Sequence, residues 1–174
     1  NGNGKLRILL FGPFSVAVAN REIPMEAWKS KKALVLFKYL VARCGERIPN
    51  DVLADFLWPD SDWESASHNL HTTVYFLRKT LKDVSAKRDV SAQIKFANGM
   101  YWFEPEEGDF LDTMEFRKLC RESENLEHTD PHQAIEAGRK GLDLYRGDFL
   151  GEDLYADWAA SIREYYREQY MELA

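Results

Sequence analysis

The residues whose types and spacing suggest chemistry lie between Ser61 and Asp83, in the run SDWESASHNLHTTVYFLRKTLKD. If this run is helical, at about 100° per residue, one of its sides presents hydrogen-bonding and stacking side chains. These side chains are His68, His71, Thr72, Tyr75 and Lys79. No carboxylate occurs between Ser65 and Lys82, although the chain has 29 acidic and 23 basic residues. A helix face of this kind is suited to a polyanion, which makes nucleic acid the predicted partner.

Other kinds of functional site have little support in the sequence. It contains no glycine-rich phosphate loop and no nucleophile elbow. His68 and His71 could bind a metal as a pair, but no third ligand stands at a suggestive spacing. The acidic run of Glu104, Glu106, Glu107 and Asp109 is typical of a solvated linker rather than of an acid–base pair. We therefore predict no enzyme activity, no cofactor and no metal site.

Composition limits the class of protein. With 174 residues, 45% of them hydrophobic, the chain can form one or two folded domains. No apolar run approaches the roughly 20 residues of a membrane span, and no signal peptide is recognisable. Cys44 and Cys120 are far apart, so we expect a reducing compartment, the cytoplasm. The chain starts without methionine and stops within a helix-like run, and we interpret it as a piece of a longer protein.

The net charge of −6 is unevenly distributed. Residues 1–110 contain 15 basic and 14 acidic side chains, a net charge of +1. Residues 111–174 contain 8 basic and 15 acidic side chains, a net charge of −7. The acidity therefore belongs to the second part of the chain, and only local patches of the first part bear on nucleic-acid binding.

The central helix needs a buried face and a helical partner. Its apolar residues recur every three or four positions, at Ala66, Leu70, Val74, Leu77 and Leu81. Ser61 and Glu64 predict a capping box at its start. A shorter helix, Asp51–Leu57, precedes it; we expect Asn50 to cap that helix and Trp58-Pro59 to end it. Two helices joined by a short loop form the helix-turn-helix pattern.

Further elements surround this pair. Leu6–Ala19 predicts two short strands joined at Gly12-Pro13, and a third strand is expected at Glu22–Pro24, which together would form an N-terminal antiparallel sheet. Ser30–Arg43 predicts a helix. The lysines around its first turn are either a solvated basic start or a phosphate clamp; they are Lys29, Lys31 and Lys32.

A hairpin is predicted after the central helix and a polar link, Val84–Ser91. Gln93–Phe96 and Met100–Phe103 are apolar-rich runs on either side of Asn98-Gly99, which is the strongest short hairpin signal. Directly behind a helix-turn-helix such a hairpin is either a wing or a simple closure of the domain. The segment Glu104–Gly108 is expected to be a linker.

The second part of the chain predicts helices only. The first covers Phe110–Leu126, and the next begins at Asp130 as cap and Pro131 in its first turn. That helix has one face of mainly small side chains, which would let two helices approach closely. The face consists of Ala134, Ile135, Gly138, Leu142 and Tyr145. A last helix, Leu154–Ala174, has aromatic residues that we interpret mainly as core: Trp158, Tyr165, Tyr166 and Tyr170.

These segments together resemble a known family. LRILLFGPFSV, KKALVLFKYLVARCGERIPNDVLADFLWPD, SASHNLHTTVYFLRKTLKD and NGMYWFEP follow one another as in the winged-helix DNA-binding domain of response regulators. The version is that of the Streptomyces antibiotic regulatory proteins. DFLDTMEFRKLC, GLDLYRGDFLGEDLYADWAA and IREYYREQYMELA resemble the bacterial transcriptional activator domain that follows in that family.

The resemblance implies the fold and the domains. The fold would be mainly α with small β elements. A winged helix-turn-helix domain with an N-terminal antiparallel sheet and a C-terminal wing hairpin would occupy residues 1–104. An all-α bundle of tetratricopeptide-like hairpins, truncated at its C-terminus, would occupy residues 109–174.

The resemblance also implies a function, sequence-specific binding of duplex DNA by a transcriptional regulator. The helix at about residues 62–82 would enter the major groove and the hairpin at about residues 93–103 would lie near the minor groove. The implied contact residues are Lys31, Lys32, His68, His71, Thr72, Tyr75, Phe76, Arg78, Lys79, Lys95 and Asn98. Direct repeats in the DNA, a dimer on DNA and contact with RNA polymerase are further expectations.

The outward helix face departs from the family pattern. His71 stands where glutamine is common, and Ser67 and Phe76 stand where arginine is common. The alternative function is therefore a protein-interaction module in a signalling regulator, with a winged helix that does not bind DNA. Steep weakening of binding with salt would distinguish DNA recognition from that alternative.

Overall fold

The computed structural model describes residues 4–84, 88–153 and 156–174 and is mainly helical with small sheets. It divides into two compact units: Asn1–Leu6 with Ala17–Asp109, and Arg7–Val16 with Phe110–Ala174. Residues 1–3, residues 85–87 of the predicted polar link and the first two residues of the predicted last helix lie outside the described residues. Within the described ranges, no helix combines the length and the apolar character that crossing a membrane requires.

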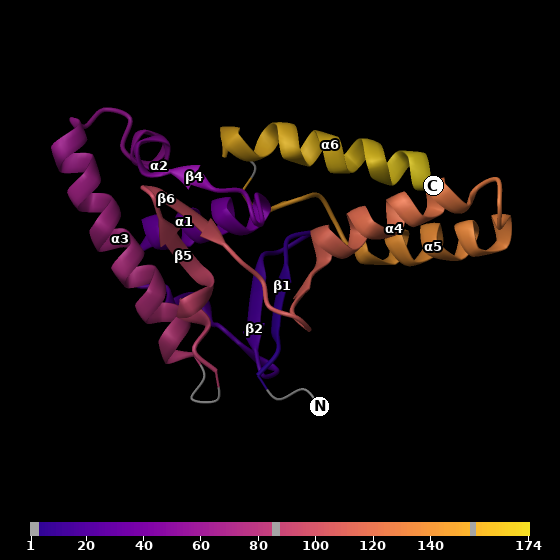
Figure 1. Cartoon of the computed structure of the whole chain (residues 1–174), viewed down its shortest axis with the longest axis horizontal. Helices are drawn as coiled ribbons and strands as arrows, with labels where there is room; N and C mark the ends of the chain where they lie inside the picture. The colour runs from indigo at the N-terminus through magenta and orange to yellow at the C-terminus, as the bar shows by residue number, and fades with distance from the viewer. Residues whose placement is uncertain (1–3, 85–87, 154–155) are drawn as a thin grey trace. The chain divides into compact units, whose positions relative to one another are not determined.

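Three helices form the body of the first unit (Figure 1): α1 Lys31–Ala42, α2 Asn50–Leu57 and α3 Trp63–Asp83. Both α1 and α2 pack against α3. The predicted apolar stripe of α3 is confirmed, because Ala66, Leu70, Val74, Leu77 and Leu81 are all buried. The opposite side of α3 is thereby turned outward.

The starts of α2 and α3 differ from the predictions. Asp62, not Ser61, caps α3, and its carboxylate accepts the Ser65 N–H at 2.8 Å. Asn50 does not cap α2 but forms its first turn after Pro49. The Asn50 N–H instead donates to the Gly99 carbonyl at 2.9 Å. Both differences are shifts of one residue, which pattern reasoning cannot resolve.

Val52 of α2 is apolar but has an exposed fraction of 45%, whereas Leu53 and Leu57 are buried. A helix of only eight residues buries a narrow stripe, and Val52 falls outside it.

The predicted hairpin forms at the expected place, as β5 Ile94–Ala97 and β6 Met100–Phe103. Ala97 lies opposite Met100 and Ile94 opposite Phe103. Asn98 and Gly99 both have positive φ, +53° and +73°, as the tightest hairpin turn requires. Gln93 is not in the strand but ends a short 3-10 helix, η2 Val90–Gln93.

A third strand, which sequence reasoning did not assign to this sheet, is β4 Ile48–Pro49. It pairs antiparallel with β6, giving the order β4-β6-β5, with Ile48 opposite Tyr101. The hairpin is therefore joined to the segment just before α2.

The strands at the N-terminus are β1 Leu6–Leu9, β2 Ser15–Val18 and β3 Arg21–Glu22, followed by a short 3-10 helix, η1 Met25–Ala27. Strands β2 and β3 pair antiparallel in the first unit. The third strand lies one to two residues before its predicted position at Glu22–Pro24, because Pro24 precedes η1.

The expectation of a purely antiparallel N-terminal sheet is wrong. In the second unit β1 pairs in parallel with β7, Phe110–Leu111, with Arg7 opposite Phe110. About one hundred residues separate the two strands, and a connection of that length permits parallel pairing. Phe110 and Leu111, predicted as helical, are therefore strand residues.

The helices of the second unit are α4 Asp112–Leu126, α5 Pro131–Leu144 and α6 Asp157–Leu173. Figure 1 shows α4 and α5 side by side, and α5 also packs against α6. The predicted cap is confirmed: Asp130 accepts the Gln133 N–H, with Pro131 at the first position.

The small-residue face of α5 is only partly as predicted. Ala134 and Gly138 are buried, and a Cβ on the neighbouring Gly141 would lie 3.0 Å from Leu173 of α6. Ile135, however, has an exposed fraction of 71%. The small residues thus allow close packing of helices, whereas Ile135 lies beside the contact face.

Residues 7–16 complete the core of the second unit. Phe11 is fully buried, and its ring centroid lies 4.9–5.2 Å from those of Phe116, Tyr145 and Tyr166. The Asp112 carboxylate accepts the N–H groups of Leu10 and Phe11 at 2.9 Å. Burial raises the pKa of Asp112 to about 6, although these hydrogen bonds act in the opposite direction. The helices thus depend on a segment about one hundred residues away in sequence.

Replacement of Phe11 by alanine should therefore destabilise the second unit by about 3–5 kcal/mol, since a buried aromatic contact is lost and a cavity remains. Hydrogen exchange of peptides from α4, α5 and α6 measures this loss directly. Met171→Ala, a change at an exposed position of α6, is the matched control. Unchanged exchange in Phe11→Ala would show that residues 7–16 do not stabilise these helices.

Candidate nucleic-acid interface

The outward face of α3 places the central candidates together. His68, His71, Thr72, Tyr75, Phe76 and Lys79 are all exposed. Tyr75 and Phe76 have exposed fractions of 60% and 37%, and their rings meet edge to face with centroids 5.6 Å apart. Large aromatic side chains on a helix surface can stack on, or contact, an apolar group of a partner.

Negative charge on α3 is confined to its two ends. Asp62 caps the helix and Glu64 lies in the first turn, where the helix dipole favours carboxylates. Hydrogen bonds from the backbone and the side chain of Ser65 lower the pKa of Asp62. The next carboxylate is Asp83, so the intervening outward surface carries only neutral and basic groups.

Two of the predicted phosphate ligands are already engaged within the first unit. Arg78 Nη2 donates to the Ile94 carbonyl at 2.9 Å and links α3 to the start of β5. Lys32 Nζ donates to the Leu57 carbonyl at 2.6 Å and lies 5.7 Å from the ring centroid of Trp58. Lys31 is exposed. A guanidinium or an ammonium group with one bond has further donors, so these contacts do not by themselves prevent phosphate binding.

The hairpin candidates are held on a constrained turn. Asn98 is exposed at the turn between β5 and β6, and Lys95 on β5 is half-buried opposite Trp102. The bond from the Asn50 N–H to the Gly99 carbonyl fixes the turn to the first residue of α2. The structure thus connects the hairpin with the α2–α3 pair, rather than leaving it as an independent arm.

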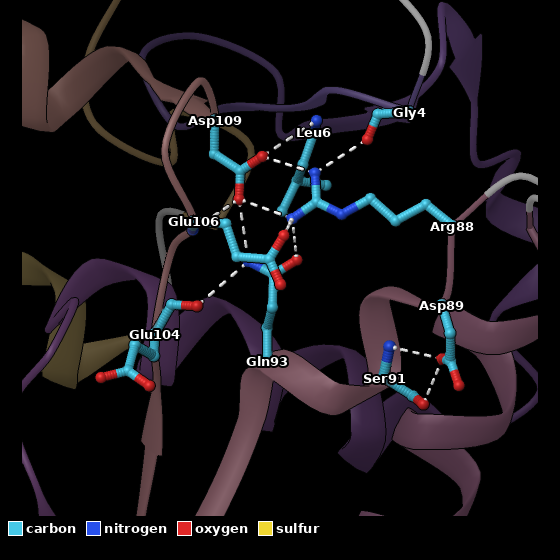
Figure 2. Close-up of polar contacts among 9 residues, drawn as sticks. All are labelled: Gly4, Leu6, Arg88, Asp89, Ser91, Gln93, Glu104, Glu106 and Asp109. Carbon is cyan, nitrogen blue, oxygen red and sulfur yellow. Dashed lines mark hydrogen bonds and ion pairs between the residues drawn. The ribbon is translucent and has the colours of Figure 1, made fainter.

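A polar cluster closes the base of the hairpin (Figure 2). The Gln93 side-chain amide donates to the Glu104 carbonyl at 3.0 Å and to the Asp109 carboxylate at 2.9 Å. The Glu104 N–H donates to the Gln93 carbonyl at 3.0 Å. Gln93 precedes β5 and Glu104 follows β6, so these bonds hold the two ends of the hairpin together.

Arg88 connects the same cluster with the chain leaving α3. Its guanidinium makes two bonds to the Asp109 carboxylate, at 2.6 and 2.9 Å, and a further bond to the Gly4 carbonyl at 2.8 Å. It also pairs with Glu106 at 2.9 Å. Bidentate pairing of this kind fixes the geometry of both partners.

The prediction that Asp109 belongs to a solvated linker is wrong, because its side chain is fully buried. Burial tends to raise the pKa of Asp109, but hydrogen bonds from Arg88, from the Glu106 N–H and from Gln93 lower it overall. Composition alone predicts a linker from Glu-Pro-Glu-Glu-Gly. The signal that sequence reasoning missed is a single arginine before the hairpin matched by a single aspartate after it.

No group of three or more histidine, cysteine, aspartate and glutamate side chains suited to a metal occurs among the residues described. His68 and His71 are exposed on α3. Their arrangement is suited to hydrogen bonds with a partner surface.

Comparisons with known proteins relate both units to others. Residues 111–174 match the family described as the bacterial transcriptional activator domain. The chain is similar in fold to the solved structure of Mycobacterium tuberculosis EmbR in complex with a low affinity phosphopeptide, with a TM-score of 0.77 and 18% identity. That alignment covers 98% of this chain and 43% of the other, so this chain spans less than half of its length. A comparison with curated protein sequences found no match.

The Arg88–Asp109 pair yields a prediction for the first unit. Asp109→Asn should lower its free energy of unfolding by about 2 kcal/mol, because the part-buried Arg88 guanidinium loses two charge-assisted hydrogen bonds and keeps only Glu106 as a counter-charge. Because the pKa of Asp109 is lowered in the folded state, its carboxylate stabilises the fold at pH values above the ordinary aspartate pKa, near 4. This contribution is lost as the pH falls below about 4 and through the lowered pKa of the folded state.

Urea unfolding followed by tryptophan fluorescence between pH 3 and pH 7 tests both statements, since Trp28, Trp58, Trp63 and Trp102 lie in the first unit. Asp83→Asn, at an exposed carboxylate, is the control. Equal stability of wild type and Asp109→Asn at pH 7 would show that the Arg88–Asp109 pair does not stabilise the first unit.

Proposed function

We propose that this chain is part of a transcriptional regulator that binds duplex DNA with sequence specificity through α3. The observation that carries the proposal is the outward face of α3, which is exposed, rich in hydrogen-bonding groups and free of carboxylates from Ser65 to Lys82. The match of residues 111–174 to the bacterial transcriptional activator domain supports a role in transcription.

In this proposal the first unit is a winged helix-turn-helix domain, in which α2 and α3 are the helix pair and β5–β6 is the wing. The N-terminal half of α3 lies in the major groove. There His68, His71 and Thr72 hydrogen-bond to base edges or phosphates. Tyr75 and Phe76 contact thymine methyl groups, or reach a phosphate through the tyrosine hydroxyl.

Basic residues around this face bind the DNA backbone. Lys79 and Lys31 are exposed and would each neutralise a phosphate. Arg78 and Lys32 would contribute through the donors that their bonds to Ile94 and Leu57 leave available. Asn98 and Lys95 would bring the hairpin to the adjacent minor groove.

The second unit acts on transcription, as a bundle of tetratricopeptide-like helical hairpins with RNA polymerase as its partner. Two copies of the chain dock as a dimer on direct repeats spaced by about one helical turn. A cytoplasmic location follows from this role.

A second candidate function is a protein-interaction module. The exposed aromatic pair Tyr75 and Phe76 favours it, because aromatic side chains are common at the centre of protein interfaces. The two functions differ in salt dependence. DNA binding weakens steeply between low and physiological salt, since counterions are released, whereas an aromatic protein contact changes little.

His71→Ala should lower the affinity for a specific DNA site by about 1–3 kcal/mol, the range for one good base contact. Fluorescence anisotropy with a labelled specific duplex and a scrambled duplex measures this difference. His132→Ala replaces an exposed histidine of the second unit and should bind as wild type. Identical titrations for His71→Ala and wild type would exclude His71 from the interface.

Lys79→Ala should weaken binding to all DNA sequences to a similar extent and reduce the slope of log K against log salt by about one. Titrations at four salt concentrations give the slope. Lys140→Ala removes an exposed lysine of the second unit and serves as the control. A slope that stays at the wild-type value would mean that Lys79 does not contact a phosphate.

A further inference from the structure

A groove of about 660 Å³ lies in the first unit, between the C-terminal half of α3 and the segment that contains β3 and η1. Its volume is within the range of small-molecule sites, which is about 300–1,000 Å³. All of its lining residues belong to this one unit.

The apolar part of the groove comes from both sides. Ile23, Pro24 and Ala27 line one wall, and Phe76 and Val84 line the other. Ile23 is buried, whereas the Phe76 ring is exposed enough to contact an occupant. An aromatic side chain opposite a short apolar wall suits a planar apolar body.

Three cations surround this apolar surface: Arg21, Lys29 and Lys79. All three are exposed, and within the described parts of the chain their side chains form no hydrogen bond or ion pair. Glu22 and Asp83 also line the groove, so the cations exceed the carboxylates by one. The lining therefore favours an occupant that carries negative charge beside an apolar body.

We propose that this groove binds a small amphipathic anion, with an aromatic body against Phe76 and its acidic group, a carboxylate or a sulfonate, among Arg21, Lys29 and Lys79. Small-ligand sites usually combine apolar walls with a few polar or charged groups that orient the ligand, and this groove has both.

Occupation of the groove should also affect DNA binding, a consequence that rests on the proposed function. Phe76 and Lys79 belong both to the groove and to the outward face of α3. An occupant therefore covers two residues that would otherwise contact DNA. Anion binding and DNA binding should compete.

Two fluorescent probes test the site directly. 1-Anilinonaphthalene-8-sulfonate carries the expected aromatic body and an acidic group, and N-phenyl-1-naphthylamine is its uncharged analogue. We expect the whole chain to bind the sulfonate about fivefold more tightly than the uncharged probe. Replacing both Lys29 and Lys79 by alanine should remove this preference.

Variants of the apolar wall complete the test. Phe76→Ala should weaken binding of both probes about tenfold, and Ala27→Trp, which fills the groove, should do the same. Ile135→Ala removes an exposed apolar side chain of the second unit and should bind as wild type. Circular dichroism of each variant confirms that the fold is retained.

Equal affinity for the two probes, or sulfonate binding unchanged in Phe76→Ala and Ala27→Trp, would overturn the site. Competition is measured separately, by adding the sulfonate to a DNA complex of the wild type. Failure to bind any DNA would count against the proposed function alone, because the probe titrations do not depend on DNA. DNA binding that is unaffected by a saturating sulfonate would overturn the overlap of the two sites.

Discussion

The burial of one stripe of α3 is the constraint on which the first unit depends. Leu70, Val74, Leu77 and Leu81 leave almost no surface exposed, and each buried leucine or valine contributes about 1.5–3 kcal/mol. These residues fix the rotation of α3 about its axis against α1 and α2. The residues on the other side are therefore presented outward as a set. The proposed recognition surface is in this sense a product of the hydrophobic core, and any change that rotates α3 would remove it.

Contacts between residues distant in sequence hold the remaining elements. In the first unit, Arg88 and Asp109 join the chain that leaves α3 to the base of the hairpin (Figure 2). In the second unit, Phe11 packs among the aromatic residues of α4 and α6, and Asp112 binds the backbone of Leu10 and Phe11. The second unit is thus completed by residues outside its main stretch of sequence, and the division between the units passes through β1 and β2.

Features with a local cause could be predicted from the sequence. The stripe of α3 repeats at helical spacing, and the turn at Asn98-Gly99 needs only its own two residues. The buried state of Asp109 and the parallel pairing of β1 with β7 could not be predicted, because each depends on a partner more than twenty residues away. The outward face of α3 was predictable for the same reason as its stripe. Arg78 was predicted as a DNA contact, and its bond to the Ile94 carbonyl could not be foreseen because it depends on the position of the hairpin.

Selection of bound duplexes from a random pool, with the whole chain at low salt, tests the central claim most directly. DNA recognition by α3 predicts a recovered sequence motif, present as two direct repeats about one helical turn apart. It also predicts that binding to this motif weakens steeply as the salt concentration rises. Recovery of no motif, together with binding that does not respond to salt, would contradict DNA recognition by α3 and would favour a protein partner for this face.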